Sequence, residues 1–200
     1  MWVVMPLGII DAAHIFTSIT DPLMSHLQLG GARSNIYIDD LLSLASSYEK
    51  GLAQDKFIQE FFLLGGWVFK PSKSSGVPSQ RVKYLGLIIN SLTMKFEIPP
   101  DKMTRLTEKA KYLLSLRRVL VKDVASWVGL LQSCRLAIGP VVSIMCRSLY
   151  DCIQNAKTWF SYIVLSPLSV SQLEWWVENL PQFSEYPICK KPTIVSFEFR

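Results

Sequence analysis

Two adjacent carboxylates, Asp39 and Asp40, stand between short apolar, β-prone runs in the segment Asn35-Ile36-Tyr37-Ile38-Asp39-Asp40-Leu41-Leu42. A regular strand sends neighbouring side chains to opposite faces of a sheet. A tight two-residue hairpin turn instead presents both acids at an exposed tip, where Asp tolerates the positive φ that such turns require. Two acids on a rigid hairpin suit a hard divalent cation, Mg²⁺ above all. The same dipeptide is also typical of a plain solvated turn, so the elements around it decide its meaning.

Basic residues gather in the stretch 102–122, which holds seven Lys or Arg and one acid, Glu108. The net charge of +6 in this stretch exceeds the +5 of the whole chain. Basic charge on one face indicates a polyanionic partner such as nucleic acid. A solvated helix face is the alternative. The first cations of the stretch are Lys102, Arg105 and Lys109.

The composition is that of a well-buried globular chain of 200 residues, because half of the residues are hydrophobic and 18% are charged. The four cysteines and two histidines lack zinc-site spacing, and no secretory signal is evident, so we expect reduced thiols in the cytoplasm or nucleus. The most apolar window, 127–145, contains Arg135 and a Gly139-Pro140 break. An Arg at mid-membrane costs roughly 2.5–3.5 kcal/mol, so we predict a buried helix and turn there and no membrane partner.

The elements that must position these residues change character near residue 98. Before it, the pattern predicts a helix capped by Asp11 and kinked or interrupted by Pro22, the hairpin around Tyr37, and a helix over 49–64. A short strand over 67–69, a polar loop over 70–80 and paired strands over 82–90 and 93–98 follow. After it, Asp101 is expected to cap a helix, and further helices are expected over 122–138, 141–157 and 170–180. A last strand is expected over 193–199.

Several segments, in this order along the chain, resemble reverse transcriptases. Met5-Pro6-Leu7-Gly8 with Ala12 and Phe16 is similar to the family's P-F-G segment, and Tyr37-Ile38-Asp39-Asp40 matches its Y-x-D-D box. Gly65-Gly66-Trp67-Val68 followed by Lys70 and Lys73 looks like the next motif, a glycine-ended helix and a lysine loop. Val82-Lys83-Tyr84-Leu85-Gly86-Leu87 is similar to the strand pair that grips the primer. The helical half, with Trp175-Trp176, is most similar to the DIRS-like, tyrosine-recombinase type of retrotransposon, and the resemblance covers about residues 2–180.

The resemblance implies an α+β fold: a partial polymerase palm, with an antiparallel sheet and helices on one face, over 1–98. A helical thumb over 99–160 and a connection with the start of a truncated following domain over 161–200 complete it. The implied partners are an RNA or DNA template with its primer, deoxynucleoside triphosphates and the remainder of a retroelement polyprotein. The implied reaction is a two-metal nucleotidyl transfer with Mg²⁺.

The resemblance also assigns roles to particular residues. Asp39 is implied as a metal ligand and Asp40 as a supporting acid, and Lys73, with Lys70 as the alternative, as the general acid for the leaving pyrophosphate. Gly8 and Tyr37 are implied at the nucleotide, where each is also consistent with an ordinary turn or strand residue. The remaining assignments are primer contacts by Tyr84, Leu85 and Gly86 and phosphate contacts by Lys102, Arg105 and Lys109.

The chain departs from the family pattern at Leu7, where an aromatic is usual, and at Ala13, where proline is usual. The family's first catalytic aspartate lies upstream of the Pro-Leu-Gly turn, and this sequence starts just before that turn. We therefore expect a piece of a longer polyprotein that is inactive by itself. A non-catalytic nucleic-acid-binding remnant that uses the basic helix 102–118 is the alternative function, and an incompletely folded gene fragment is a third possibility.

Overall fold

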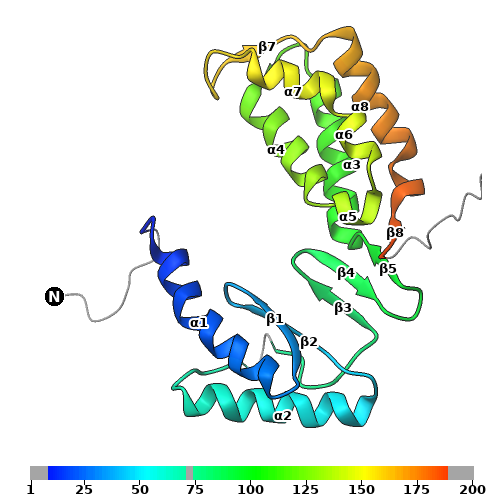
Figure 1. Ribbon diagram of the computed structural model, residues 1–200. Coiled ribbons are helices and arrows are strands. Elements are labelled where there is room, and N and C mark those ends of the chain that lie inside the picture. The colour runs from blue at the N-terminus through cyan, green and yellow to red at the C-terminus, as the bar shows by residue number, and fades with distance from the viewer. Residues whose placement is uncertain (1–8, 71–73, 189–200) are drawn as a thin grey trace, which may run out of the picture. The chain divides into compact units, whose positions relative to one another are not determined.

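The computed structural model of the chain describes residues 9–70 and 74–188. These residues form two compact units that divide between residues 79 and 80, and each unit is described by itself. The expected α+β class is confirmed, with antiparallel sheets and helices in the described part of the chain (Figure 1). The strand expected over 193–199 lies outside the described residues. The palm, thumb and connection boundaries predicted above stay a prediction.

The first unit packs two helices against one β-hairpin (Figure 1). Its elements are α1 (Ala12–Leu29), β1 (Arg33–Tyr37), β2 (Asp40–Leu44) and α2 (Tyr48–Leu64). The helix ends predicted at Gly30-Gly31 and Gly65-Gly66 are confirmed. A small buried core joins α1, the chain just before β1, and α2; it comprises Met24, Leu27, Ala32, Ile58 and Phe62.

Helix α1 runs through Pro22 without interruption. Proline removes one main-chain donor, and Met24, two residues after it, belongs to the buried core of this unit. Asp11 stands at the N-cap position, but its backbone is helical and its side chain makes no capping hydrogen bond, so the predicted cap is wrong. Helix α2 does carry such a cap, because the Ser47 hydroxyl accepts a hydrogen bond from the Lys50 amide at 3.2 Å.

The strand predicted over 67–69 is wrong, because this segment belongs to no helix or strand. Trp67 and Phe69 set their rings edge-to-face against Phe62, with centroid distances of 6.2 and 5.6 Å. Aromatic packing on α2 therefore holds this segment in place of strand pairing.

The second unit contains a four-stranded antiparallel sheet in the order β3-β4-β5-β8. Its strands are β3 (Arg81–Tyr84), β4 (Leu87–Asn90), β5 (Lys95–Glu97) and β8 (Glu185–Pro187). The single strand predicted over 82–90 is wrong, because a two-residue turn at Leu85 and Gly86 folds it into the hairpin β3-β4. Both turn residues have positive φ, +47° and +74°, as a tight hairpin turn of this twist requires.

The rest of this unit is helical, with one small ribbon. The long helices are α3 (Pro100–Ser115), α4 (Val121–Gln132) and α8 (Pro167–Asn179), and shorter ones are α5 (Arg135–Ile138), α6 (Val141–Ile144), α7 (Arg147–Gln154) and the 3₁₀ turn η1 (Leu180–Phe183). Strands β6 (Val119–Leu120) and β7 (Tyr162–Ile163) pair, and neither strand was expected from the sequence. The single helix predicted over 141–157 is two short helices, α6 and α7.

Helix α3 starts one residue before the predicted cap. Pro99 is the N-cap and Pro100 the first helical residue, so Asp101 lies within the first turn rather than at the cap. A carboxylate there still stabilises the helix through its dipole. Leu106 and Ala110 of this helix are buried.

The core of the second unit closes around two fully buried tryptophans. The indole of Trp127 donates to the Leu106 carbonyl at 2.9 Å, and that of Trp176 donates to the Met145 carbonyl at the same distance. Each buried indole N–H therefore has an acceptor, as burial demands. Burial in this core also raises the pKa of the Cys146 thiol to about 12. Among residues 9–70 and 74–188, no helix is both long and apolar enough to cross a membrane.

Candidate functional site

The acidic pair lies at the turn of the hairpin β1-β2, as predicted, but the two acids occupy different places. Tyr37 pairs with Asp40, so the two-residue turn consists of Ile38 and Asp39. Asp40 is the first residue of β2. The positive φ of the turn, +54°, falls on Ile38 and on neither acid, so the expectation that Asp supplies it is wrong. The prediction of a tight hairpin around the acids is confirmed.

The register determines which face of the hairpin each side chain shares. Ile36 and Leu41 pair directly and pack against the core of the first unit. Cross-strand partners share a face and successive pairs alternate, so Tyr37 and Asp40 lie on the opposite face. Both are exposed, as is Asp39.

This outer face continues from the turn into an open hollow at the base of the hairpin. The hollow is lined by Gln28, Gly31, Ala32, Arg33, Ser34, Asn35, Leu42 and Leu44. Arg33 and Asn35 alternate with buried Ser34 along β1, so their polar groups stand on the same face as Tyr37 and Asp40. One face of the ribbon therefore offers a carboxylate, a phenol, an amide and a guanidinium.

The carboxylate oxygens at the turn are the type of ligand that Mg²⁺ prefers. Magnesium in enzymes is held by one or two carboxylates, and waters and substrate phosphates complete its octahedron. Asp39 and Asp40 supply two adjacent exposed carboxylates. Within residues 9–70 and 74–188, no cluster of three or more His, Cys, Asp or Glu side chains could hold a metal ion.

Two further predicted residues, Gly8 and Lys73, lie outside the described residues. Lys70, the alternative to Lys73, is exposed just after the aromatic segment, and its carbonyl accepts a hydrogen bond from the Ser74 amide at 3.1 Å. The structure thus places Tyr37, Asp39 and Asp40 together on one hairpin and describes Lys70 on the same unit.

In the second unit, the predicted primer-gripping residues lie at the turn of the hairpin β3-β4. Tyr84 ends β3, and Leu85 and Gly86 form the turn. The Lys102 ammonium group donates a hydrogen bond to the Gly86 carbonyl at 3.1 Å, which ties the turn to the first part of α3. Lys102, predicted for phosphate contact, is therefore partly engaged in holding this turn.

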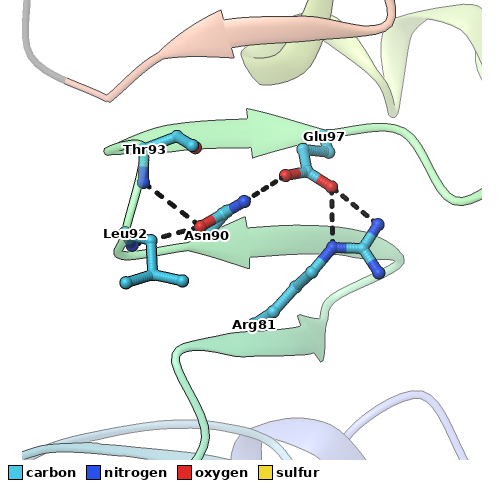
Figure 2. Close-up of polar contacts among 5 residues, drawn as sticks. All are labelled: Arg81, Asn90, Leu92, Thr93 and Glu97. Atoms are coloured by element: carbon cyan, nitrogen blue, oxygen red, sulfur yellow. Dashed lines mark hydrogen bonds and ion pairs between the residues drawn. The ribbon is translucent and has the colours of Figure 1, made fainter.

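The carboxylate of Glu97 links three strands of the sheet behind this turn, as Figure 2 shows. Glu97 on β5 accepts hydrogen bonds from Asn90 at 2.5 Å and from the Arg81 guanidinium at 2.7 and 2.9 Å. The side-chain oxygen Oδ1 of Asn90 in turn accepts hydrogen bonds from the Leu92 and Thr93 amides, which closes the β4-β5 turn. The Asn90 amide, and then Arg81, hold the pKa of Glu97 below its usual value.

The basic face of α3 borders a second open hollow, which is lined by Arg105, Glu108, Lys109, Tyr112 and Leu130. The Lys109 ammonium group donates to the Ser126 hydroxyl of α4 at 2.6 Å. Arg105, predicted for phosphate contact, is exposed. Tyr112, which no sequence motif singled out, lies seven residues and two turns from Arg105 on the same helix face.

The fold as a whole is that of part of a reverse transcriptase. The chain is similar to the foamy viral protease-reverse transcriptase in complex with double-stranded DNA, with a TM-score of 0.70, 18% identity and coverage of 96% of this chain and 37% of that one. The dRH form of the same protein with double-stranded DNA matches with a TM-score of 0.69, 20% identity and coverage of 90% of this chain and 29% of that one. The complex with an RNA/DNA hybrid matches with a TM-score of 0.67, 19% identity and coverage of 90% of this chain and 22% of that one.

No protein-family model and no curated protein sequence matches the chain. The chain spans between about a fifth and two-fifths of the length of these structures. At 18–20% identity the likeness establishes a reverse-transcriptase-like fold.

Proposed function

We propose that this chain is part of an RNA-directed DNA polymerase of a DIRS-like retrotransposon. Its two units would contribute the acidic hairpin of the palm and the primer-binding turn with the thumb. The observation that carries the proposal is the exposed Tyr37-Ile38-Asp39-Asp40 turn within a reverse-transcriptase-like fold. The structures similar to this chain hold double-stranded DNA or an RNA/DNA hybrid, which supports a template–primer duplex as the partner.

The exposed carboxylates of Asp39 and Asp40 would hold Mg²⁺. When bound, the metal ions supply charge stabilisation for transfer of a nucleotide to a primer 3′-hydroxyl. Tyr37 shares the hairpin face of Asp40 and offers a flat ring there to nucleotide or primer. Arg105 and Lys109 would contact phosphates, and Tyr112 lines the same hollow.

Metal binding at the hairpin can be tested without requiring turnover. Fe²⁺ replaces Mg²⁺ in a carboxylate site and, with ascorbate, cleaves the backbone nearby. We expect cleavage within residues 37–42 when the 200-residue chain is mixed with primer–template and a deoxynucleoside triphosphate, and suppression by excess Mg²⁺. Asp39→Asn/Asp40→Asn should abolish this cleavage, whereas the matched pair Asp11→Asn/Asp21→Asn at α1 should keep it. Unchanged cleavage in the hairpin variant would contradict the proposed metal site.

Catalysis is a separate measurement. We expect primer extension by the 200-residue chain with Mg²⁺ or Mn²⁺ to show no product. Template-dependent incorporation that disappears in Asp39→Ala would establish the polymerase directly and overturn the expectation of inactivity.

A non-catalytic nucleic-acid-binding protein is the second candidate, and the basic hollow on α3 favours it because phosphate binding there needs no metal. Removing one cation that neutralises a phosphate should reduce the slope of log K against log[salt] by about 0.9. We therefore expect Arg105→Glu/Lys109→Glu to weaken binding of a duplex and to reduce this slope by about 1.8. Lys50→Glu/Lys56→Glu, the same charge change on α2, is the control. Equal weakening in both variants would mean that only net charge matters.

A further inference from the structure

One end of the second unit exposes three aromatic side chains on a short segment between α7 and α8. Trp159, Phe160 and Tyr162 are 58, 73 and 61% exposed. We call these three residues the aromatic ledge; the β7 label in Figure 1 marks its end. Single exposed apolar residues need no explanation, but a contiguous group indicates an interaction site.

Main-chain hydrogen bonds fix the ledge against the start of α4. The Val121 amide donates to the Ser161 carbonyl and the Lys122 amide to the Trp159 carbonyl, both at 3.1 Å. Tyr162 pairs with Leu120 in the ribbon β6-β7. The ledge is therefore a preformed surface, and binding there costs little ordering of the backbone.

Two cations contact the ledge. The Arg118 guanidinium donates to the Tyr162 carbonyl at 3.1 Å, and the Lys122 ammonium group lies 5.8 Å from the centroid of the Phe160 ring. Arg117, next to Arg118 in the sequence, and Lys157, two residues before Trp159, are also exposed. The sequence has no acid over 109–122 or 152–173, and half-buried Asp123 is the nearest one in sequence to the ribbon.

We propose that the aromatic ledge with Arg117, Arg118, Lys122 and Lys157 binds single-stranded nucleic acid by base stacking. Flat aromatic faces beside cations match unpaired bases on a phosphate backbone, whereas a duplex hides its base faces. An apolar protein partner would not call for four cations in two segments, 109–122 and 152–173, that contain no acid. This site goes beyond the duplex contacts proposed for α3.

The test is fluorescence anisotropy of the full 200-residue chain with a labelled 12-nucleotide oligothymidine. Trp159→Leu/Phe160→Leu keeps the apolar character but removes the stacking faces, so we expect about a tenfold or larger rise in Kd. Trp159→Phe alone keeps a flat face and should bind nearly as wild type. The matched control, Tyr48→Leu/Phe57→Leu on α2, replaces two partly exposed aromatics of the other unit and should leave Kd unchanged.

A second variant tests the charges independently. Lys122→Gln/Lys157→Gln should reduce the salt slope for the single strand by about 1.4, at about 0.7 per phosphate. Neither ledge variant should change binding of a blunt duplex more than about twofold, so failure of this site and failure of the α3 proposal are distinguishable.

The proposal is overturned if wild-type chain does not bind the single strand, or if the leucine variant binds it as tightly as wild type. It is also overturned if the leucine variant changes only the sedimentation of the chain, which would make the ledge a contact between copies. Loss of binding only to phosphatidylserine vesicles would overturn it in favour of a membrane surface. Thermal unfolding of each variant checks that the second unit is intact.

Discussion

At the scale of single residues, the acidic turn illustrates what sequence can and cannot specify. Two acids between apolar β-prone runs predicted the hairpin, and the structure has it. The sequence did not reveal that Ile38 takes the left-handed conformation, because a β-branched residue is among the least suited to it. The pairing register, which puts Ile38 and Asp39 in the turn, depends on Ile36 and Leu41 both reaching the core.

Gly139 is a residue on which the second unit depends. Its φ and ψ of +94° and −167° lie in a region that is essentially restricted to glycine. A Cβ there would lie 2.5 Å from Cε2 of Tyr186, so the ring on β8 occupies the space that a side chain would need.

We expect Gly139→Ala to lower the free energy of unfolding of the second unit by about 2 kcal/mol or more, from backbone strain of about 1–3 kcal/mol and the clash with Tyr186. Gly129→Ala is the matched control, because a Cβ there meets nothing within 4 Å and the site is helical. That change should be neutral or stabilise by about 0.5–1 kcal/mol. Urea unfolding followed by tryptophan fluorescence measures both, and similar destabilisation in the two variants would contradict this account.

At the scale of elements, sequence patterns predicted α1 and α2 well, whereas the helices predicted over 122–138 and 141–157 are each divided in two, into α4 and α5 and into α6 and α7. Both ends of α2 were foreseen within one residue, because its apolar periodicity and the glycine boundary at its end agree. The hairpin β3-β4 was read as one strand, since Leu85-Gly86 is not a typical turn pair and Lys102 supplies part of the support through the Gly86 carbonyl. Strand β8 could not be predicted, because its pairing with β5 spans about ninety residues.

The sheet of the second unit should lose stability in acid through Glu97. Hydrogen bonds from Asn90 and Arg81 lower the pKa of this carboxyl in the folded state, so they stabilise its charged form more than its neutral form. The resulting stability is present above the unfolded-state value of 4.5 and is lost as the pH falls through the lower folded value.

Glu97→Gln should therefore destabilise the second unit by about 1–2 kcal/mol at pH 7, the value for charged hydrogen bonds discounted for the exposure of Arg81. The difference from wild type should shrink as the pH falls below about 4.5 and nearly vanish once Glu97 is protonated in both states. Urea midpoints from pH 7 to 3 measure this, with Glu174→Gln on the exposed side of α8 as control. A difference independent of pH would exclude the charged network as its cause.

At the scale of the whole molecule, the described residues build two hydrophobic cores, and each draws its members from one unit. The sequence indicated a change near residue 98, where prolines precede the helical half, whereas the compact units divide between 79 and 80. The strands β3, β4 and β5 belong to the second unit because Leu87 and Ile98 pack into its helical core. Local composition does not reveal such long-range packing.

Two leucines make this organisation testable with the same substitution in each core. Leu27 in the first unit and Leu131 in the second are both fully buried. Leu27→Ala and Leu131→Ala should each cost about 2–5 kcal/mol through reduced burial and the cavity left behind. Because the cores are separate, we expect calorimetry of the 200-residue chain to resolve two transitions. Leu27→Ala should lower one of them and Leu131→Ala the other, whereas one transition shifted by both variants would mean that the cores unfold as a single cooperative body.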